Sequence, residues 1–132
     1  MNLPTLASLM HRDVHCVGMD DTVADVERHL VDGRLSWAPV RDLDGTLLGV
    51  LSATDLARFH ADGRDPHAVR AWQLCTWKAI TVPPDATLPE VAQAMIDRHV
   101  HHVVVGEGAR VLGVVSALDL AAVVAREAAV PH

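Results

Sequence analysis

Aromatic side chains are nearly missing from this chain of 132 residues, which has no tyrosine and a single phenylalanine. Alanine, valine and leucine must therefore fill the interior, which favours helices packed closely on sheets. With a hydrophobic content of 50%, the chain is long enough for one compact domain, whereas either half alone would be marginal. We therefore expect the two halves to share a core.

The sequence also lacks an excess of basic residues and any long apolar run. The formal net charge is −6, which argues against nucleic acid as a partner. No apolar run approaches the roughly 18 residues of a membrane span, and the start of the chain lacks the charged and apolar regions of a signal peptide. Only two cysteines occur, Cys16 and Cys75, at different places in the two halves. We therefore expect a reduced, cytoplasmic protein that makes no membrane contact.

The chain does contain an internal repeat. The segment 49–55, of sequence GVLSATD, returns at 113–119 as GVVSALD. Upstream of the turn at Asp44-Gly45 the offset between the copies is longer by a single position, as from Thr22 to Thr87. A turn tolerates such a change in length. Two copies predict two similar units packed together, because a solenoid needs three or more.

Hydrophobic spacing and turn residues predict the same order of elements in each half: lead-in helix, strand, helix, strand, strand, helix. In the first half these elements are residues 3–10, 14–17, 22–33, 37–41, 47–51 and 52–60. In the second half they are residues 68–74, 79–82, 88–99, 102–105, 110–115 and 117–129. The polar residues 61–67 read as the connection. The predicted division is therefore a first repeat at 1–60 and a second at 68–132, each with its own lead-in helix.

These features resemble the CBS-domain family, named after cystathionine β-synthase, in its tandem form, the Bateman module. The resemblance covers almost the whole chain. It rests on the element order, the repeat that relates Thr22 to Thr87, and a closing phrase of glycine, two apolar residues, serine or threonine, two residues, and aspartate. It implies an α/β (α+β) fold in which two pseudo-symmetric β-α-β-β-α repeats pack through their sheets. It also implies a standalone protein of bacterial type with no fused effector domain.

The family's paired domains usually bind adenosine-containing ligands in the clefts between repeats. The resemblance assigns Asp55 and Asp119 to the ribose, since a carboxylate can accept a hydrogen bond from each hydroxyl of a diol. It assigns Ser52 and Ser116 to the phosphate, since a hydroxyl beside a helix N-terminus can donate to an anion. The same Ser-x-x-Asp spacing is also that of an ordinary capping box, and the two interpretations are compatible.

The resemblance places the base among apolar groups of the strands, and the two sites should differ. Trp37 can stack on a base or simply fill space, and Cys16 is a poorer donor than its counterpart Thr81. The second site lacks a counterpart of Pro39. The remaining predicted contacts in the first repeat are Val17 and Ala38, and those in the second repeat are Val82, His101, His102 and Val103.

Histidines are the remaining unusual feature, with nine in the chain. His99, His101 and His102 stand where family members often carry basic residues that meet phosphates. A partly charged imidazole predicts that phosphate binding strengthens as the pH falls. We do not expect a metal site, because no CxxC pattern is present and adjacent strand residues point to opposite faces.

Nothing in the sequence indicates catalysis, because nucleophile-elbow and Walker sequences are absent. The two aspartates occupy equivalent repeat positions, which suits two ligands better than one reaction. We therefore expect a non-enzymatic regulatory module that requires no cofactor. It would bind AMP, ADP, ATP or S-adenosylmethionine, form a homodimer and signal to a separate regulated protein. The alternative is a ligand-free structural or oligomerisation module, with or without a bound metal.

Overall fold

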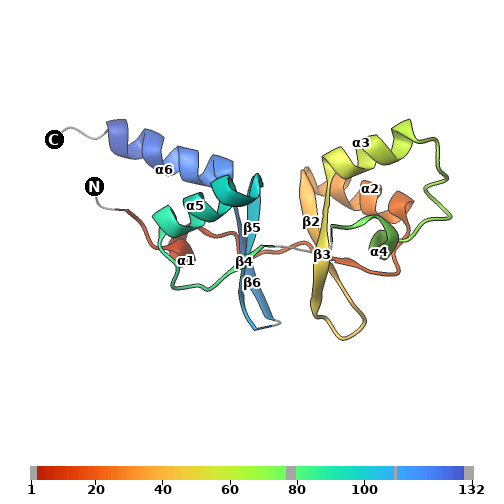
Figure 1. The fold of residues 1–132 in the computed structure, drawn as a ribbon, viewed down its shortest axis with the longest axis horizontal. Coiled ribbons are helices and arrows are strands. Elements are labelled where there is room, and N and C mark those ends of the chain that lie inside the picture. The colour runs from red at the N-terminus through yellow and green to blue at the C-terminus, as the bar shows by residue number, and fades with distance from the viewer. Residues whose placement is uncertain (1–2, 77–79, 109, 130–132) are drawn as a thin grey trace. The chain divides into compact units, whose positions relative to one another are not determined.

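The computed structural model describes residues 3–76, 80–108 and 110–129, and these form two compact units. The first-repeat unit is His15–Ala79, and the second-repeat unit combines Met1–Val14 with Ile80–His132. In each unit the helices cover one face of a three-stranded sheet (Figure 1). The mixed α/β class and the duplicated architecture predicted from the sequence are confirmed.

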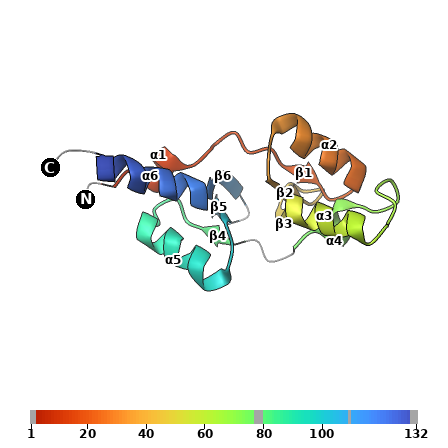
Figure 2. The same ribbon diagram turned by 90° about the horizontal axis from the view of Figure 1, so that it is seen from above.

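In the first-repeat unit, β1 pairs with β2 in parallel and β2 pairs with β3 antiparallel, so the sheet order is β1-β2-β3. Helices α2 and α3 lie side by side (Figure 2). The elements are β1 (Val17–Gly18), α2 (Val23–Gly33), β2 (Trp37–Arg41), β3 (Leu47–Ser52), α3 (Ala53–Ala61) and α4 (Ala71–Leu74).

The second-repeat unit repeats this plan, with β4 parallel to β5, β5 antiparallel to β6, and α5 beside α6 (Figure 2). The elements are α1 (Leu6–Leu9), β4 (Thr81–Val82), α5 (Leu88–Arg98), β5 (His102–Glu107), β6 (Arg110–Ser116) and α6 (Ala117–Ala129). Within the described ranges, no helix combines the length and the apolar character needed to cross a bilayer.

Helix α2 shows how local sequence sets the elements that carry the site. Thr22 accepts a hydrogen bond from the backbone N–H of Asp25, and the Asp25 carboxylate accepts one from the N–H of Thr22. This capping box satisfies two N–H groups that lack partners inside the helix. Val23, Val26 and Leu30 recur at helical spacing and are buried. Burial of each such side chain contributes about 2 kcal/mol. The predicted capping pairs of α2 and of α5, Thr87 with Glu90, are both confirmed.

The lead-in helices do not pack with the repeat that follows them along the chain. Leu6 and Met10, from the α1 segment, lie in the core of the second-repeat unit. Val69 and Cys75, from the α4 segment, lie in the core of the first-repeat unit. The spatial units therefore exchange lead-in helices relative to the division at 1–60 and 68–132. The two lead-in segments resemble each other, so their order in the sequence does not reveal this exchange.

Glycines in the closing phrases allow the exchanged segments to pair with the sheets. Thr76 forms a two-residue bridge with Val50, and a Cβ on Gly49 would collide with the Thr76 carbonyl oxygen. In the other unit His11 bridges to Val114, and a Cβ on Gly113 would lie 3.0 Å from the His11 carbonyl oxygen. The close backbone approach that each glycine permits is therefore made by a lead-in segment.

Several predicted bounds differ from the structure. The lead-in helices are shorter than predicted, because Thr5 and Arg70 are extended and each helix begins only after them. The first strand is Val17–Gly18 rather than 14–17. The predicted strand at 79–82 is found as Thr81–Val82, and Ala79 lies outside the described residues. β5 continues two residues beyond the prediction, to Glu107.

Candidate functional site

The register of β2 and β3 brings the first residue of β2 next to the start of α3. Trp37 lies opposite Ser52, and the backbone N–H of Ala53 donates to the Ser36 carbonyl oxygen at 2.8 Å. The indole-bearing residue and the first turn of α3 are therefore neighbours. The predicted first site, with Trp37, Ser52 and Asp55, is assembled within one unit.

Asp55 forms a capping box but uses only part of its carboxylate for it. Its Oδ2 accepts from the backbone N–H of Ser52 at 2.9 Å and lies 3.0 Å from Ser52 Oγ. The backbone N–H of Asp55 donates to Ser52 Oγ at 3.2 Å. Oδ1 has no hydrogen-bond partner among the described residues, and the side chain is half-buried. The capping and ligand interpretations of this motif are therefore both compatible with the geometry.

Other predicted contacts of the first repeat point away from such a ligand. The side chains of Val17 and Ala38 belong to the apolar core under the helices. Strand side chains alternate between faces, so Ala38 points opposite to Trp37 and Pro39. A ligand beside Trp37 would meet only main-chain atoms at Val17 and Ala38. Their predicted contact with a ligand stays a prediction, and it would involve the main chain.

Cys16 lies just before β1 and is half-buried. Burial raises the pKa of its thiol, although the nearby Arg41 guanidinium works in the opposite direction. The thiol is therefore mostly protonated at neutral pH and unsuited to act as a nucleophile. Arg41 also has a buried Nε without a hydrogen-bond partner in the described part of the chain.

The second-repeat unit builds the equivalent arrangement. His102 lies opposite Ser116 in the β5–β6 pair, and the N–H of Ala117 donates to the His101 carbonyl oxygen at 2.7 Å. Asp119 Oδ2 accepts from the N–H of Ser116 at 2.8 Å, and the N–H of Asp119 donates to Ser116 Oγ at 3.1 Å. The first turn of α6 therefore repeats the geometry of the first turn of α3.

His11 makes the second arrangement different from the first. Its Nε2 lies 3.0 Å from Asp119 Oδ1, and the Asp119 side chain is 19% exposed. Burial by itself raises the pKa of Asp119, but hydrogen bonds from His11 and Ser116 outweigh it, so the pKa lies below its usual value. Sequence reasoning missed His11. The signal was present, because extending the repeat upstream aligns His11 with Thr76.

The histidines of the second repeat do not share one role. Burial, followed by the neighbouring charge of His101, lowers the pKa of His102 to about 4. His102 is therefore neutral between pH 6 and pH 8 in the ligand-free protein, and its predicted contact with phosphate stays a prediction. His99 and His101 are exposed, and their predicted contact with phosphate stays a prediction. Thr81 is exposed on β4, whereas Val82 and Val103 belong to the core.

Metal ligands are not grouped in the described ranges, where no cluster of three or more histidine, cysteine or acidic side chains could hold an ion. Cys16 and Cys75 belong to the first-repeat unit, and His99 and His101 belong to the second-repeat unit. Burial raises the pKa of the Cys75 thiol as well.

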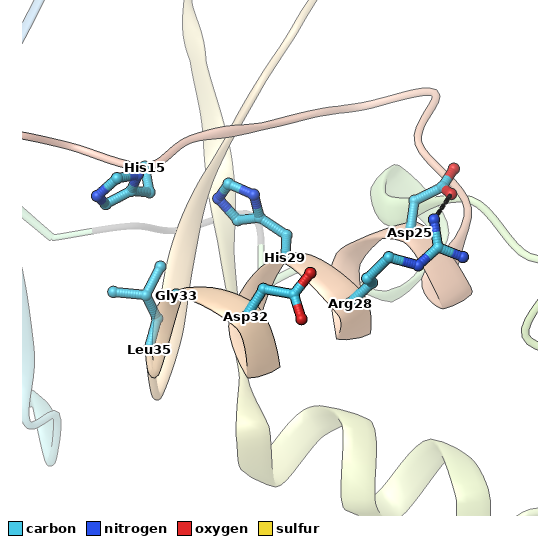
Figure 3. Close-up of a pocket in the computed structure, with 7 residues that line it drawn as sticks. All are labelled: His15, Asp25, Arg28, His29, Asp32, Gly33 and Leu35. Carbon is cyan, nitrogen blue, oxygen red and sulfur yellow. Dashed lines mark ion pairs between the residues drawn. The ribbon is translucent and has the colours of Figure 1, made fainter.

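A cavity of about 410 Å³ lies along α2, and Figure 3 shows the side chains that line it. The rings of His15 and His29 stand 5.9 Å apart between centroids. Asp25 and Arg28 form an ion pair at 3.8 Å, marked in Figure 3. Asp25 also caps α2, so its carboxylate has a structural function already. The cavity contains none of the predicted ligand contacts.

A second cavity of about 420 Å³ lies between α2 and α3 and is mainly apolar. Its lining includes Leu30, Val31 and Leu56, with His60 and Glu27 paired at its edge. It also excludes Asp55. The features that point to a ligand therefore lie at the strand–helix junctions rather than in these two cavities.

Comparison with known proteins identifies the family. The family model described as the CBS domain matches residues 6–62 and again residues 71–126. Arabinose 5-phosphate isomerase KpsF of Escherichia coli is 28% identical over 118 residues, which are 89% of this chain but 36% of KpsF. The chain thus spans about a third of that relative. Hypoxic response protein 1 of Mycobacterium tuberculosis is 26% identical over 120 residues, which are 90% of this chain and 84% of that protein.

Solved structures show the same fold. The CBS domain pair of protein MJ0100, in complex with 5-methylthioadenosine and S-adenosyl-L-methionine, has a TM-score of 0.86 at 18% identity and covers 96% of this chain and 99% of its own. A putative signal-transduction protein with CBS domains from Burkholderia ambifaria MC40-6 has a TM-score of 0.87 at 23% identity, covering 97% and 98%. Hypoxic Response Protein I, with two coordinated zinc ions, has a TM-score of 0.79 at 25% identity, covering 90% and 98%.

Proposed function

The chain belongs to the CBS-domain family as a tandem pair of CBS repeats, and from this premise we propose that it is a regulatory module for adenosine-containing nucleotides. The proposed ligands are AMP, ADP, ATP or S-adenosylmethionine, and the proposed output is a signal to a separate protein. The complex of the MJ0100 pair with two adenosine-containing ligands supports this ligand class. The module is proposed to regulate rather than to catalyse and to require no cofactor.

The proposal rests on the Asp55 carboxylate, in which only one of the two oxygens accepts hydrogen bonds from the described residues. One oxygen caps α3 together with Ser52, and the other has no partner in the described part of the chain. A carboxylate held by its own helix turn is preorganised, so a sugar hydroxyl can bind without reordering the side chain. The neighbouring Trp37 offers an aromatic face for the base.

The anion would be bound by main-chain groups more than by Ser52. The Ser52 hydroxyl already lies against Asp55 Oδ2, so its hydrogen points to that carboxylate. In the first turn of α3 the N–H groups of Ala53 and Asp55 already donate to the Ser36 carbonyl oxygen and to Ser52 Oγ, which leaves the N–H of Thr54 for an anion. The helix start also carries a partial positive charge. We therefore assign phosphate binding to this helix start, with Ser52 holding Asp55 in place.

The proposal includes a homodimer and a cytoplasmic location. Val31 and Ile96 occupy equivalent repeat positions and are 74% and 65% exposed. Leu118 and Val124 on α6 are also largely exposed, and such apolar surface favours association with another module.

Both cysteines are free thiols, as in proteins of reducing compartments. A change in module packing can transmit occupancy only where the ligand binds two packings with different affinity.

A thermal-shift panel with AMP, ADP, ATP and S-adenosylmethionine tests the proposal. A ligand at 100 times its dissociation constant adds about 2.7 kcal/mol to the free energy of unfolding. Asp55→Asn should reduce that shift. Asp25→Asn is the matched control, because it alters an equivalent capping box on α2 without a predicted ligand contact. A flat response of the unmodified protein to all four ligands would contradict the proposal.

The second candidate function is a ligand-free structural or oligomerisation module, with or without a metal. Complete backbone capping by both Ser-x-x-Asp motifs favours it, because capping alone explains their presence. The two zinc ions of Hypoxic Response Protein I are the reason to include metal. Metal analysis of protein purified without a histidine tag, combined with the ligand panel, separates this candidate from the nucleotide module.

A further inference from the structure

We infer that His11 is a specificity-determining residue that reserves the Asp119 carboxylate of the second-repeat unit and thereby directs the nucleotide to the first-repeat unit. This inference rests on the proposed function and concerns which of the two aspartates binds a sugar diol. The Ser-x-x-Asp motifs are nearly identical, so the difference arises outside them. It arises from the lead-in segments, which place different side chains beside the two motifs.

The backbone holds His11 in place before its side chain makes any contact. Its N–H donates to the Val114 carbonyl oxygen at 2.9 Å, and the N–H of Val114 donates back at 3.0 Å. The preceding Met10 is 7% exposed and packs against Gly113. Because the main chain of His11 is paired with β6, its imidazole lies next to the start of α6.

The contact engages the second oxygen of Asp119. Oδ2 is held by the N–H of Ser116, and Oδ1 is held by His11. Both oxygens therefore have partners, and the lowered pKa of this carboxyl reflects the same contacts. The His11 side chain is 63% exposed, so a ligand can displace it, but only by giving up this hydrogen bond. A diol that binds Asp119 must therefore compete with the His11 imidazole, which belongs to the same protein unit.

The first-repeat unit has no such competitor at the equivalent position. Thr76 pairs with Val50 as His11 pairs with Val114, but its short side chain makes no hydrogen bond to Asp55 in the described structure. Oδ1 of Asp55 is therefore left for a ligand hydroxyl. The two motifs share their capping geometry and differ in the one oxygen that a diol needs.

The second-repeat site can be measured alone in the Asp55→Asn protein. We expect His11→Ala in that background to raise the affinity for AMP about three- to tenfold by calorimetry, since one hydrogen bond to a carboxylate is no longer displaced. The gain should be much smaller for 2′-deoxy-AMP, which lacks the diol. Thr76→Ala is the matched control and should leave the affinity unchanged. Asp119→Asn in the double variant should abolish the gain.

The outcomes separate this inference from the proposed function. If the unmodified protein binds AMP but His11→Ala in the Asp55→Asn background changes neither the affinity nor the preference for AMP over 2′-deoxy-AMP, the inference on His11 is wrong and the nucleotide module stands. If neither the unmodified protein nor the His11→Ala variant binds any adenosine-containing ligand, both the proposed function and this inference are wrong. His11→Asn is a second variant that keeps the main-chain pairing should the alanine protein not fold, and it should give a gain in the same direction.

Discussion

Trp37 lies directly opposite Ser52 in the antiparallel pairing of β2 with β3, and the same register sets His102 opposite Ser116. Each residue therefore stands beside a helix start that carries a capping aspartate. The repeat has kept the backbone and changed the side chain from an indole to an imidazole. The two sites consequently offer different surfaces to a flat base, a large apolar ring in the first and a smaller neutral one in the second.

Replacement of Trp37 tests base stacking in the first-repeat unit. Stacking of a base on an aromatic side chain contributes about 1–3 kcal/mol. We expect Trp37→Leu to weaken AMP binding at least about fivefold by calorimetry. Trp72→Leu, on α4, should leave the affinity unchanged. Equal affinity in both variants would show that the indole only fills space beside Ser52.

Removal of the cap hydroxyls measures the structural part of the site. Ser52→Ala and Ser116→Ala each remove the acceptor for the N–H of the capping aspartate. We expect each variant to lose about 1 kcal/mol in the free energy of unfolding, measured by urea denaturation. Thr22→Ala on α2 provides the reference for a cap without a predicted ligand. An unchanged stability for Ser52→Ala would show that its contacts do not support α3.

Local signals in the sequence predicted much of this fold and the capping boxes of α2 and α5. The spacing of Val23, Val26 and Leu30 fixed the face of α2, and the capping pairs fixed the helix starts, because these signals act within a few residues. The contact of His11 with Asp119 could not be predicted in this way. It joins residues that are 108 positions apart, and it depends on which repeat each lead-in segment joins.

Strand alternation limits what four of the predicted ligand contacts can offer. These four residues, which adjoin other predicted contacts in the sequence, are Val17, Ala38, Val82 and Val103. In a strand, adjacent side chains point to opposite faces, so a continuous stretch cannot line one site. Here these residues face the helices, and all of them are buried in the cores of their units.

Adding a methyl group at the two equivalent glycines should have unequal effects. A Cβ on Gly49 would collide with the carbonyl oxygen of Thr76, which is backbone paired with Val50. A Cβ on Gly113 would first meet Met10 Sδ at 2.8 Å, which is part of a flexible side chain. We expect Gly49→Ala to lose about 2–3 kcal/mol and Gly113→Ala about 1 kcal/mol in the free energy of unfolding. Urea denaturation measures both.

Gly45→Ala is the control for backbone conformation rather than collision. Gly45 has a φ of +83° and nothing within 4 Å of an added Cβ, so its replacement produces left-handed strain alone, worth about 1 kcal/mol. If Gly49→Ala loses no more stability than Gly45→Ala, the approach of the Thr76 segment to β3 is looser than the structure shows.

The lowered pKa of His102 predicts that this residue makes the fold less stable in acid. In the unfolded chain a histidine takes up a proton as the pH falls below about 6.5, whereas folded His102 resists it until about pH 4. Between these values the unfolded state binds more protons, so the free energy of unfolding decreases as the pH is lowered. Because His102 is only partly buried, solvent screening limits the effect to about 1–2 kcal/mol at pH 5.

His102→Gln removes this titration while keeping a polar side chain opposite Ser116. The comparison is the free energy of unfolding of the variant minus that of the unmodified protein, from urea denaturation at pH 8 and at pH 5. We expect this difference to shift in favour of the variant by about 1–2 kcal/mol on acidification.

The other histidines are present in both proteins, so their contributions largely cancel. The lowered pKa of Asp119 acts below this range, since a depressed carboxyl pKa reduces stability only as the pH falls through its own value. A difference that is the same at both pH values would mean that folded His102 accepts a proton as readily as the unfolded chain does, and it would support this residue as a phosphate-binding charge.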